Sequence, residues 1–501
     1  MLKLFIIGAV LELLMVTSFF WRYRFWILLV SIFLTAFSSG MILVNNFNLI
    51  MIVLFIASLF RLTSLIRVTE QRLHESYLRR VVLRTSISLI AAQIILYAVW
   101  FVGDKYFSGV VSNNITTDIA SMVQLIFAMA LLFVTRKSLK STSFKPIRGH
   151  YADKDLPTVT VAIPARNETV DLSACLSAVV ASDYPKLEVI VLDDCSQDKT
   201  SDIIKGFARD GVRFIHGSEP QDNWLAKNQA YEQLSEAATG QYIVFLSVDT
   251  HISTSTIRTI ITSALDNKKT MICILPRQRF NGFLASAIQP MRNWWELALP
   301  RRFTNRPAIS SSCWMITRKA LAKAGDFEAV SRAVLPEAYF ARKEILTDSY
   351  SFLRSNGSVE VSSIKDFNDQ FDRAMRVRYP EVHKKIELVM LLSMAEVLFL
   401  LAPVVLFLLA MLTLSPILLI TTTTTMGLLV YTHHLILKAT NPDYKLISMF
   451  NFPIMVITEI GLGIYSMIRY EFSEVDWKGR NICLPVMHVT PYIKPVNSHV
   501  K

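Results

Sequence analysis

The sequence has few cysteines, and their spacing excludes the common cysteine-based sites. None of the five lies in a CxxC pair or beside histidines at zinc-finger intervals, so neither a disulfide framework nor a structural zinc site is indicated. This usage fits a reducing compartment. The five are Cys175, Cys195, Cys273, Cys313 and Cys483.

Charged residues make up 18% of the chain against 52% hydrophobic residues, and long stretches at both ends have almost none. The first three runs are each long enough to cross a hydrocarbon core of about 30 Å at about 1.5 Å per helical residue, whereas the runs at 86–102 and 118–134 are weaker candidates. We therefore expect an integral membrane protein, with about five helices in residues 1–135 and transmembrane or interfacial helices in 386–470. The candidate spans are Leu2–Trp21, Phe25–Val44, Leu49–Ile66, Ser86–Val102, Asp118–Val134, Leu388–Leu412, Ile417–Leu437 and Met449–Met467.

Basic residues collect in alternate loops. They lie at residues 22–24, 61–84 and 136–148, whereas loop 45–48 has no positive charge. By the positive-inside rule this predicts a multi-pass protein of the cell membrane with its central polar region in the cytoplasm. Juxtamembrane lysines and arginines also explain the net charge of +12 through anionic lipid head groups. The lipid bilayer is thus an expected partner, and nucleic acid is not.

A basic linker (136–155) leads into a region of ordinary polarity, residues 156–385. Apolar runs alternate there with amphipathic helical patterns, which predicts a Rossmann-like α/β domain with a mostly parallel sheet. Ligands of such sheets bind beyond the carboxyl ends of the strands. Three of the expected strands end in strongly polar segments at this position. The expected strands are 158–165, 187–194, 212–217 and 241–249, and the polar segments are PARNE, DDCSQD and SVDTH.

Eight motifs carry a family resemblance: IPARNE, VLDDCSQDKT, NWLAKNQA, FLSVDT, ITRKAL, ILTDSYSFLRSNGSVEV, QFDRA and WKGR. In order and spacing the chain resembles the membrane-bound family 2 glycosyltransferases of GT-A fold, above all those that glycosylate ceramide, hopanoid or carotenoid lipids. The resemblance covers about residues 155–385 and WKGR in the tail, 471–501. It implies a GT-A domain inserted between two helical membrane blocks. It also implies an inverting glycosyltransferase that moves a sugar from a nucleotide-sugar donor to a membrane lipid acceptor at the cytoplasmic face.

Four polar residues match positions that contact the nucleoside in this family. Asn167 and Glu168 lie in PARNE, and Asp193 and Asp194 lie in VLDD. A strand-to-helix cap is the alternative for each pair, with Ser196 or Asp198 as further capping candidates. The sequence does not distinguish which aspartate contacts the nucleotide.

The metal motif departs from the family pattern. The chain reads FLSVDTH, so Ser247 replaces the first aspartate of DXD while Asp249 remains. A divalent metal, Mn²⁺ or Mg²⁺, takes some of its oxygen ligands from the diphosphate, so one carboxylate can suffice. His251 is a second candidate ligand, and its alternative is a solvated side chain at a strand end.

The resemblance implies that Asp348, in LTDSYS, is the catalytic base. Thr347 replaces the acidic residue that usually precedes it. Direct displacement at the anomeric carbon needs a carboxylate near the acceptor hydroxyl and inverts the configuration. A helix cap is the alternative for Asp348, and Glu337 in LPEAYF is the rival carboxylate.

Five further residues match the family's diphosphate or acceptor site, although solvated helix surface or membrane anchoring explains the cations nearly as well. Ala374 replaces the tryptophan of QxxRW, which removes an aromatic surface that holds polymer ends and counts against a processive synthase. The five are Lys227, Gln370, Arg373, Lys478 and Arg480.

The sequence leaves open whether two apolar segments, 279–303 and 449–467, lie at the membrane interface. Residues 279–303 mix tryptophans and arginines, which favours an interfacial helix over a core helix of the domain. Three full spans after the domain would put WKGR outside the cell. The span at 449–467 carries Pro453 and Glu459, so it could instead be interfacial or re-entrant.

Two alternative functions stay open. One is a processive polysaccharide synthase. The other is a catalytically inactive membrane protein that binds nucleotide sugars, since Ser247, Thr347 and Ala374 each erode a family motif.

Overall fold

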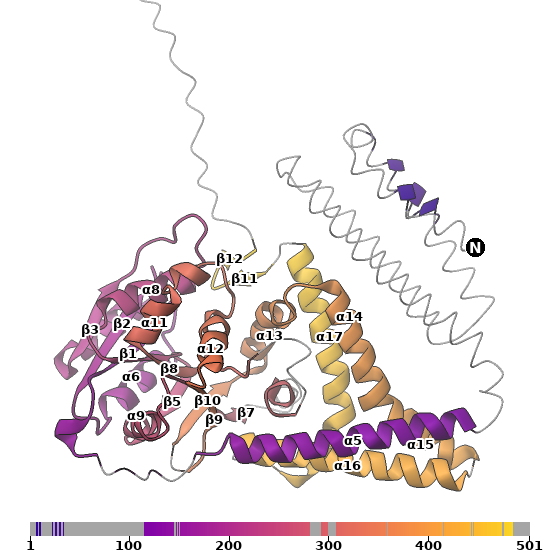
Figure 1. Ribbon diagram of the computed structural model, residues 1–501. Helices are drawn as coiled ribbons and strands as arrows, with labels where there is room; N and C mark the ends of the chain where they lie inside the picture. Colours follow the sequence, from indigo (N-terminus) through magenta and orange to yellow (C-terminus); the bar gives the residue numbers. More distant parts are fainter. Residues whose placement is uncertain are drawn as a thin grey trace, which may run out of the picture. The chain divides into compact units, whose positions relative to one another are not determined.

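The computed structural model describes most of the chain after residue 114 (Figure 1). The four expected spans before residue 103, the basic loop at 61–84 and the end of the tail lie outside the described residues. Apart from a few single positions, the described ranges are 115–144, 151–280, 292–298, 307–413 and 415–483.

The chain divides into two compact units, which we describe separately. The sheet unit comprises residues 143–277, 309–363 and 476–501, and the helical unit comprises 1–142, 278–308 and 364–475. Residues 278–308 and 364–385 thus group with the helices, although the sequence suggested one domain over 156–385.

A seven-stranded mixed sheet, ordered β3-β2-β1-β4-β8-β6-β9, forms the centre of the sheet unit. The reversed strand β8 is antiparallel to β4 and β6, and every other adjacent pair is parallel. The expectation of a mostly parallel sheet is confirmed. The strands are β1 (Val159–Ala165), β2 (Leu187–Asp193), β3 (Val212–His216), β4 (Tyr242–Leu246), β6 (Met271–Leu275), β8 (Cys313–Thr317) and β9 (Tyr350–Arg354).

All strands of this sheet except β8 run in one direction, so their carboxyl ends lie at one edge. We call this the carboxyl edge. The residues that follow Ala165, Asp193 and Leu246 belong to it. Because β8 is reversed, it begins there, with Cys313 opposite Leu246. Beyond the edge, β5 (Thr250–Ile252) pairs antiparallel with β10 (Val361–Lys365).

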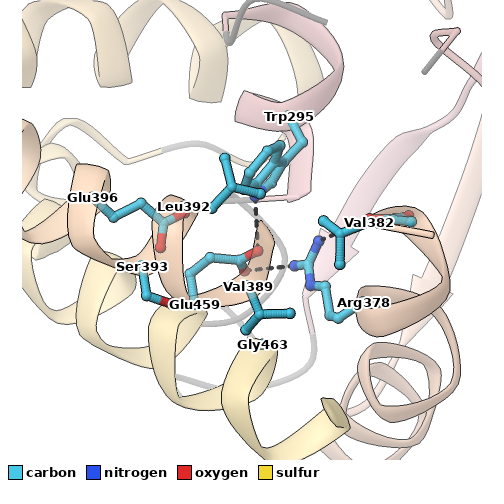
Figure 2. A pocket seen from close by; sticks show the side chains of 10 residues that line it. Trp295, Arg378, Val382, Val389, Leu392, Ser393, Glu396, Glu459 and Gly463 are labelled. Carbon is cyan, nitrogen blue, oxygen red and sulfur yellow. Dashed lines mark hydrogen bonds and ion pairs between the residues drawn. The ribbon is translucent and has the colours of Figure 1, made fainter. Parts of the chain in front are cut away.

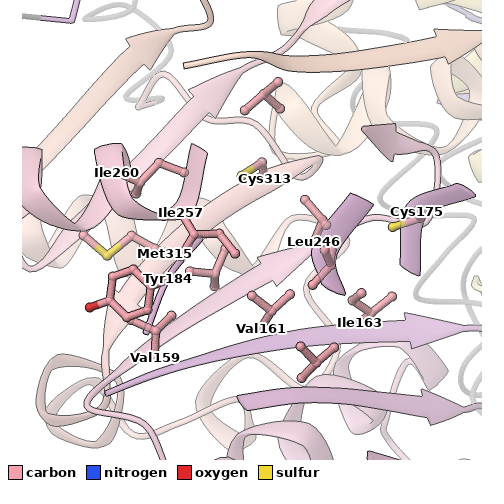
Figure 3. Packing of buried hydrophobic residues seen from close by; sticks show 14 of the residues in the cluster. Val159, Val161, Ile163, Cys175, Tyr184, Leu246, Ile257, Ile260, Cys313 and Met315 are labelled. Carbon is pink, nitrogen blue, oxygen red and sulfur yellow. The ribbon is translucent and has the colours of Figure 1, made fainter. Parts of the chain in front are cut away.

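Apolar side chains cover both faces of the sheet. On one face, Val161, Ile163 and Leu246 pack under α6 (Leu172–Val180) and α9 (Thr256–Asp266), as Figure 3 shows. Successive strand residues point to opposite faces, so Phe245 lies on the other face. There it forms an aromatic cluster between α8 (Ala226–Ala237) and α12 (Pro336–Leu346), with Tyr231, Trp314, Phe327 and Phe340.

The helical unit contains long apolar helices. Among the described residues, three segments are long and apolar enough to cross a membrane: Thr117–Ser141, Leu388–Leu408 and Ser448–Glu471. Pro453 lies in the first turn of α17, where proline is tolerated, so it begins this helix and does not break it. The helices are α5 (Ile115–Ser141), α13 (Phe367–Glu381), α14 (Ile386–Glu396), α15 (Ala402–Thr413), α16 (Pro416–Thr440) and α17 (Phe452–Glu471), and a π-helical turn (Val397–Leu401) joins α14 to α15.

The described part of the expected interfacial helix is packed inside the helical unit. Trp294 is fully buried, stacks on Phe452 and donates its indole N–H to His433 Nδ1 at 2.9 Å. Residues 299–303, with Arg301 and Arg302, lie outside the described residues. The tryptophans of this segment therefore form part of a helix interface.

Candidate functional site

The loops after β1 and β2 are joined by side chains at the carboxyl edge. The buried Arg166 donates from Nη1 to the backbone oxygens of Asp194 at 2.5 Å and Cys195 at 3.0 Å. Asn167, in the left-handed region at φ 51°, accepts from the Gln197 N–H at 2.9 Å through its side-chain oxygen. The two loops therefore form one surface. Sequence reasoning missed Arg166, although it lies inside IPARNE.

The two aspartates at the end of β2 have different partners. Asp193 Oδ1 accepts from the backbone N–H of Ser196 at 3.1 Å, and Oδ2 accepts from the hydroxyl of Ser201 in α7 (Thr200–Gly206). The side chain is buried. Asp193 thus caps the turn that leads into α7, the capping role that the sequence left open for this pair.

Asp194 is instead bound by a residue 286 positions further along the chain. Arg480 Nη1 donates to both carboxylate oxygens of Asp194 at 2.8 Å, and Nη2 donates to Glu219 at 3.1 Å. Burial raises the pKa of Asp194, whereas Arg480 opposes that rise. A buried carboxylate needs such a partner because an unpaired charge away from water is costly.

The WKGR motif forms a tight hairpin between β11 (Asp476–Trp477) and β12 (Arg480–Asn481). Its two turn residues, Lys478 and Gly479, have φ of 49° and 79°, as a type I′ turn requires. Lys478 Nζ lies 2.6 Å from Glu168 Oε1 and 3.2 Å from the Asn167 carbonyl oxygen. Both basic residues of the motif therefore contact the loops after β1 and β2.

Opposite charges accumulate where this hairpin meets the sheet. Burial raises the pKa of Glu168 and the nearby charge of Asp249 adds to the rise, whereas Lys478 lowers it. Arg166, Lys478 and Arg480 supply three cations at the carboxyl edge. This arrangement can hold a ligand that carries hydrogen-bond donors at one end and negative charge at the other.

The segment after β4 carries the candidate metal ligands. Ser247 donates its backbone N–H to the Ser312 carbonyl at 2.9 Å, which attaches this segment to the start of β8. Asp249 and His251 are half-buried. Among the described residues, no group of three or more His, Cys, Asp or Glu side chains could hold a metal by itself. Asp249 and His251 therefore suit a cation that takes most of its ligands from a diphosphate. These two side chains would supply the remaining ligands.

Asp348 lies at the opposite edge of the sheet. It precedes β9, whose first residue, Tyr350, pairs in parallel with the first residue of β6. Its side chain is 99% exposed, and Lys269 Nζ lies 3.1 Å from its Oδ1. The five residues of β9 separate the two edges by about 16 Å at about 3.3 Å per residue. The geometry does not support Asp348 as a base beside the other candidate residues.

Glu337, the rival carboxylate, lies at the carboxyl edge. It occupies the first turn of α12, and the hydroxyl of Ser311, two residues before β8, donates to its Oε1. The side chain is fully buried, and its Oε2 has no hydrogen-bond partner. Phe340 stacks on Trp314 with centroids 6.2 Å apart and so attaches α12 to the sheet.

The remaining sequence candidates belong to both units. Lys227, in the first turn of α8, lies over the ring of Tyr231 at 5.2 Å. Gln370 and Arg373 lie on α13, in the helical unit. Ala374 is buried there against Met375 and Leu462, so a small side chain suits the position of the family tryptophan.

Sequence reasoning also missed two arginines at the carboxyl edge. Arg354 ends β9, and Arg277 follows β6. Burial lowers the pKa of Arg354, and repulsion from Arg277 lowers it further. The signal for both was a basic residue directly after an apolar strand. Paired arginines at a strand end can bind an anion.

Comparison with known sequences finds likenesses over most of the first six strands of the sheet unit. Residues 160–325 match the family described as Glycosyl transferase family 2. The glycosyltransferase AglE of Haloferax volcanii is 39% identical over 98 residues, 19% of this chain and 31% of AglE. The 4,4'-diaponeurosporenoate glycosyltransferase of Staphylococcus aureus is 26% identical over 163 residues, 31% of this chain and 40% of that enzyme. Residues 160–325 are thus similar to family 2 glycosyltransferases, and the chain spans less than half of the length of each of these relatives.

Two further likenesses concern a lipid-linked substrate and a solved structure. The GalNAc(5)-diNAcBac-PP-undecaprenol beta-1,3-glucosyltransferase of Campylobacter jejuni is 27% identical over 112 residues, 22% of this chain and 35% of that enzyme. The mannosyltransferase PcManGT from Pyrobaculum calidifontis, solved with GDP-Man and Mn²⁺, has 16% identity and a TM-score of 0.42, over 70% of this chain and 99% of its own.

The different partners of Asp193 and Asp194 generate a prediction. Asp193→Ala should lower the melting temperature of the ligand-free protein, because the Ser196 N–H and the Ser201 hydroxyl lose their acceptor. Asp194→Ala should weaken nucleoside diphosphate binding by roughly 1.5 to 3 kcal/mol, the range for a hydrogen bond to a charged group. Thermal melts and calorimetry with UDP and GDP measure both. Equal losses of stability with unchanged affinity would show that the end of β2 is a structural cap.

Proposed function

We propose that this chain is an inverting, metal-dependent glycosyltransferase that transfers a sugar from a nucleotide-sugar donor to a membrane lipid at the cytoplasmic face. The observation that carries the proposal is the hairpin of Lys478 and Arg480 against Asp194 and Glu168, at the carboxyl edge of a family 2 domain. This edge is where parallel α/β sheets bind their ligands.

The donor would bind with its two ends in different surroundings. The nucleoside offers N–H and O–H donors, which suit the carboxylate of Asp194 and the polar groups of Asn167 and Glu168. The diphosphate is anionic and suits Arg166, Lys478 and Arg480. Because Arg480 already pairs with Asp194, donor binding would redistribute its hydrogen bonds between that carboxylate and a phosphate.

Asp249 and His251 would hold the divalent cation. Bound there, the cation would neutralise charge on the departing diphosphate. A carboxylate with an imidazole suits Mn²⁺ better than Mg²⁺, since imidazole is a softer ligand than oxygen. Lys227, on the first turn of α8, remains a candidate for a further phosphate contact.

Glu337 is the preferred general base for the acceptor hydroxyl. In one displacement the hydroxyl oxygen bonds to the anomeric carbon, its proton goes to the carboxylate, and the bond to the diphosphate oxygen breaks. Oε2 of Glu337 has no partner and can take this proton, whereas Oε1 is held by Ser311. Since Glu337 is buried, the acceptor must displace the groups that cover it. Asp348 remains the competing prediction.

A lipid acceptor agrees with the apolar helical unit and with two relatives. The names of those relatives specify an undecaprenol-linked glycan and 4,4'-diaponeurosporenoate, a carotenoid acid. A processive synthase is the weaker alternative, because Ala374 offers no aromatic surface to a polymer end. An inactive binding protein is also the weaker alternative, because it would need neither the general base that we assign to Glu337 nor the metal ligand that we assign to Asp249.

The contacts of the hairpin bear on membrane topology. Because Arg480 pairs with Asp194, we expect residues 364–475 to cross the membrane an even number of times. We favour α14–α15 and α16 as the two crossings. α17 packs along the polar helix α13, where Tyr379 and Met375 both bond to the Ser466 hydroxyl, and its Glu459 pairs with Arg378. Hydropathy favours α17 over α16, but Lys438, in the last turn of α16, and Lys445, which follows this helix, suit the cytoplasm.

The choice of base is tested by a pair of isosteric variants. Glu337→Gln should leave donor affinity nearly unchanged and lower transfer by at least about the hundredfold expected of a lost general base. Asp348→Asn, at the other edge of the sheet, should keep transfer within about threefold of wild type. Single-turnover transfer and calorimetry with the donor measure both. The reverse pattern would restore Asp348 as the base.

The metal site makes a second prediction. Asp249→Asn should abolish the dependence of donor binding on Mn²⁺, because it removes the carboxylate that we assign to the cation. Calorimetric titration of donor with and without Mn²⁺ measures the effect, and Asp348→Asn is the matched control. Unchanged manganese dependence in Asp249→Asn would exclude this residue as a ligand.

The topology is tested with single cysteines and an impermeant thiol reagent in intact cells. A cysteine at Ser415, between α15 and α16, should be labelled from outside. Cysteines at Lys140 and Asp443, and the native Cys483, should be shielded. Labelling of Asp443→Cys would show that α17 crosses in place of α16, and labelling of Cys483 would contradict an even number of crossings.

A further inference from the structure

The helical unit contains a cavity whose lining includes several charged side chains. Its walls come from α13, α14, α17 and the helical residues 292–297 (Figure 2). Arg378, Glu396 and Glu459 face it, and each is at least nine-tenths buried. Such groups are rare in apolar helices unless they have partners or bind a ligand.

Some of these groups hold one another in place. Arg378 Nη2 donates to Glu459 Oε2 at 2.6 Å, and the indole N–H of Trp295 donates to Glu459 Oε1 at 2.8 Å. Figure 2 shows Trp295 and Arg378 converging on Glu459. Both oxygens of Glu459 are therefore occupied, and this carboxylate forms a fixed wall of the cavity.

Other polar atoms in the same cavity have no partner. Glu396 Oε1 and the Nε and Nη1 atoms of Arg378 are buried without a hydrogen bond. Arg378 Nη1 lies 3.9 Å from Glu381 Oε2, which is beyond hydrogen-bond distance. Buried polar atoms in this condition are costly, so a ligand that satisfies them gains affinity.

The unpartnered atoms define the chemistry of that ligand. It must donate to the carboxylate of Glu396 and accept from the guanidinium of Arg378. A fully ionised phosphate has no hydrogen to donate to Glu396, and the carboxylates of Glu396 and Glu459 would repel it more than the one guanidinium of Arg378 attracts it. Glu381, the third carboxylate of the lining, pairs with Arg292. An ammonium group cannot accept from Arg378. An uncharged hydroxyl does both.

We propose that this cavity binds the uncharged, hydroxyl-bearing head group of a lipid, with its apolar part against Val389 and Leu392 of α14. The lipid site itself does not depend on the proposed function. Only its link to the acceptor rests on that function: in a transferase, the acceptor would come from this class of lipid. α14, which lines the cavity, belongs to the segment Leu388–Leu408, which is apolar enough to cross a membrane and so gives such a lipid access from the bilayer.

Gly463 permits a test that fills the cavity without removing a contact. An added Cβ meets nothing within 4 Å at Gly463, which lines the cavity, or at Gly461, which is exposed on the same helix. Leucine also has a higher helix propensity than glycine at both positions. Gly463→Leu should therefore occupy the cavity, and Gly461→Leu is its matched control.

The probes are dioleoylglycerol and dioleoylphosphatidic acid, which have the same acyl chains and differ in a hydroxyl against a phosphate. Native mass spectrometry of the full chain in detergent should show at least tenfold tighter binding of dioleoylglycerol. Gly463→Leu should reduce that binding at least tenfold, and Gly461→Leu should leave it within twofold. Glu396→Leu should also reduce it without loss of melting temperature, since it replaces an unpaired buried carboxylate.

Equal binding in Gly463→Leu and Gly461→Leu, or preference for the phosphatidic acid, would overturn the proposal. If Gly463→Leu has a lower melting temperature than Gly461→Leu, lipid binding by Glu396→Leu decides instead: undiminished binding of dioleoylglycerol in that variant would overturn the proposal. Binding is measured without any sugar donor. Loss of transfer with intact lipid binding would thus refute only the proposed function, and intact transfer with unselective lipid binding would refute only this site.

Discussion

The common direction of the strands determines where chemistry can occur in the sheet unit. Because β1, β2 and β4 are parallel, Arg166, Asp194 and Asp249 follow their strands at the same edge. The reversed strand β8 begins there and brings Ser311 to Glu337. The same rule places a residue that precedes a parallel strand, such as Asp348, at the other edge. The position of a side chain before or after its strand thus decides its partners more firmly than its chemical type does.

The pair of Asp194 and Arg480 is the second constraint, since it closes a loop of 286 residues across the helices. Its energy comes from charge-assisted hydrogen bonds of one guanidinium nitrogen, Nη1, to both oxygens of a carboxylate that is almost inaccessible to water. The type I′ turn of Lys478 and Gly479 is short and fixed, so it positions both cations at little entropic cost. A motif near the end of the chain thereby completes a surface that begins at residue 166.

The sequence predicted the parts of this architecture that depend on local patterns. Strands β1 to β4 follow from their apolar runs, and the edge that carries the polar segments follows from their direction. The sequence could not predict which aspartate caps the turn and which pairs with an arginine. Asp193 bonds to Ser201 and Asp194 to Arg480, and these partners lie near them only after folding. The grouping of 292–298 with the helices depends on Trp294 against His433 and Phe452, contacts over more than 130 residues. The position of Asp348 was predictable, since it lies before an apolar strand.

The buried charged groups of the two units differ in how completely their hydrogen bonds are satisfied. Arg480 and Asp194 satisfy each other at the carboxyl edge, where Arg480 is partly exposed, so an anionic ligand can share the guanidinium with Asp194. Arg378 satisfies Glu459 with one nitrogen and keeps two others buried without partners. A pair of apolar residues would serve stability at least as well there, since isolated buried ion pairs rarely exceed a hydrophobic replacement in stability. Retaining an incomplete set of hydrogen bonds inside apolar helices is therefore better explained by a ligand that completes it than by stability alone.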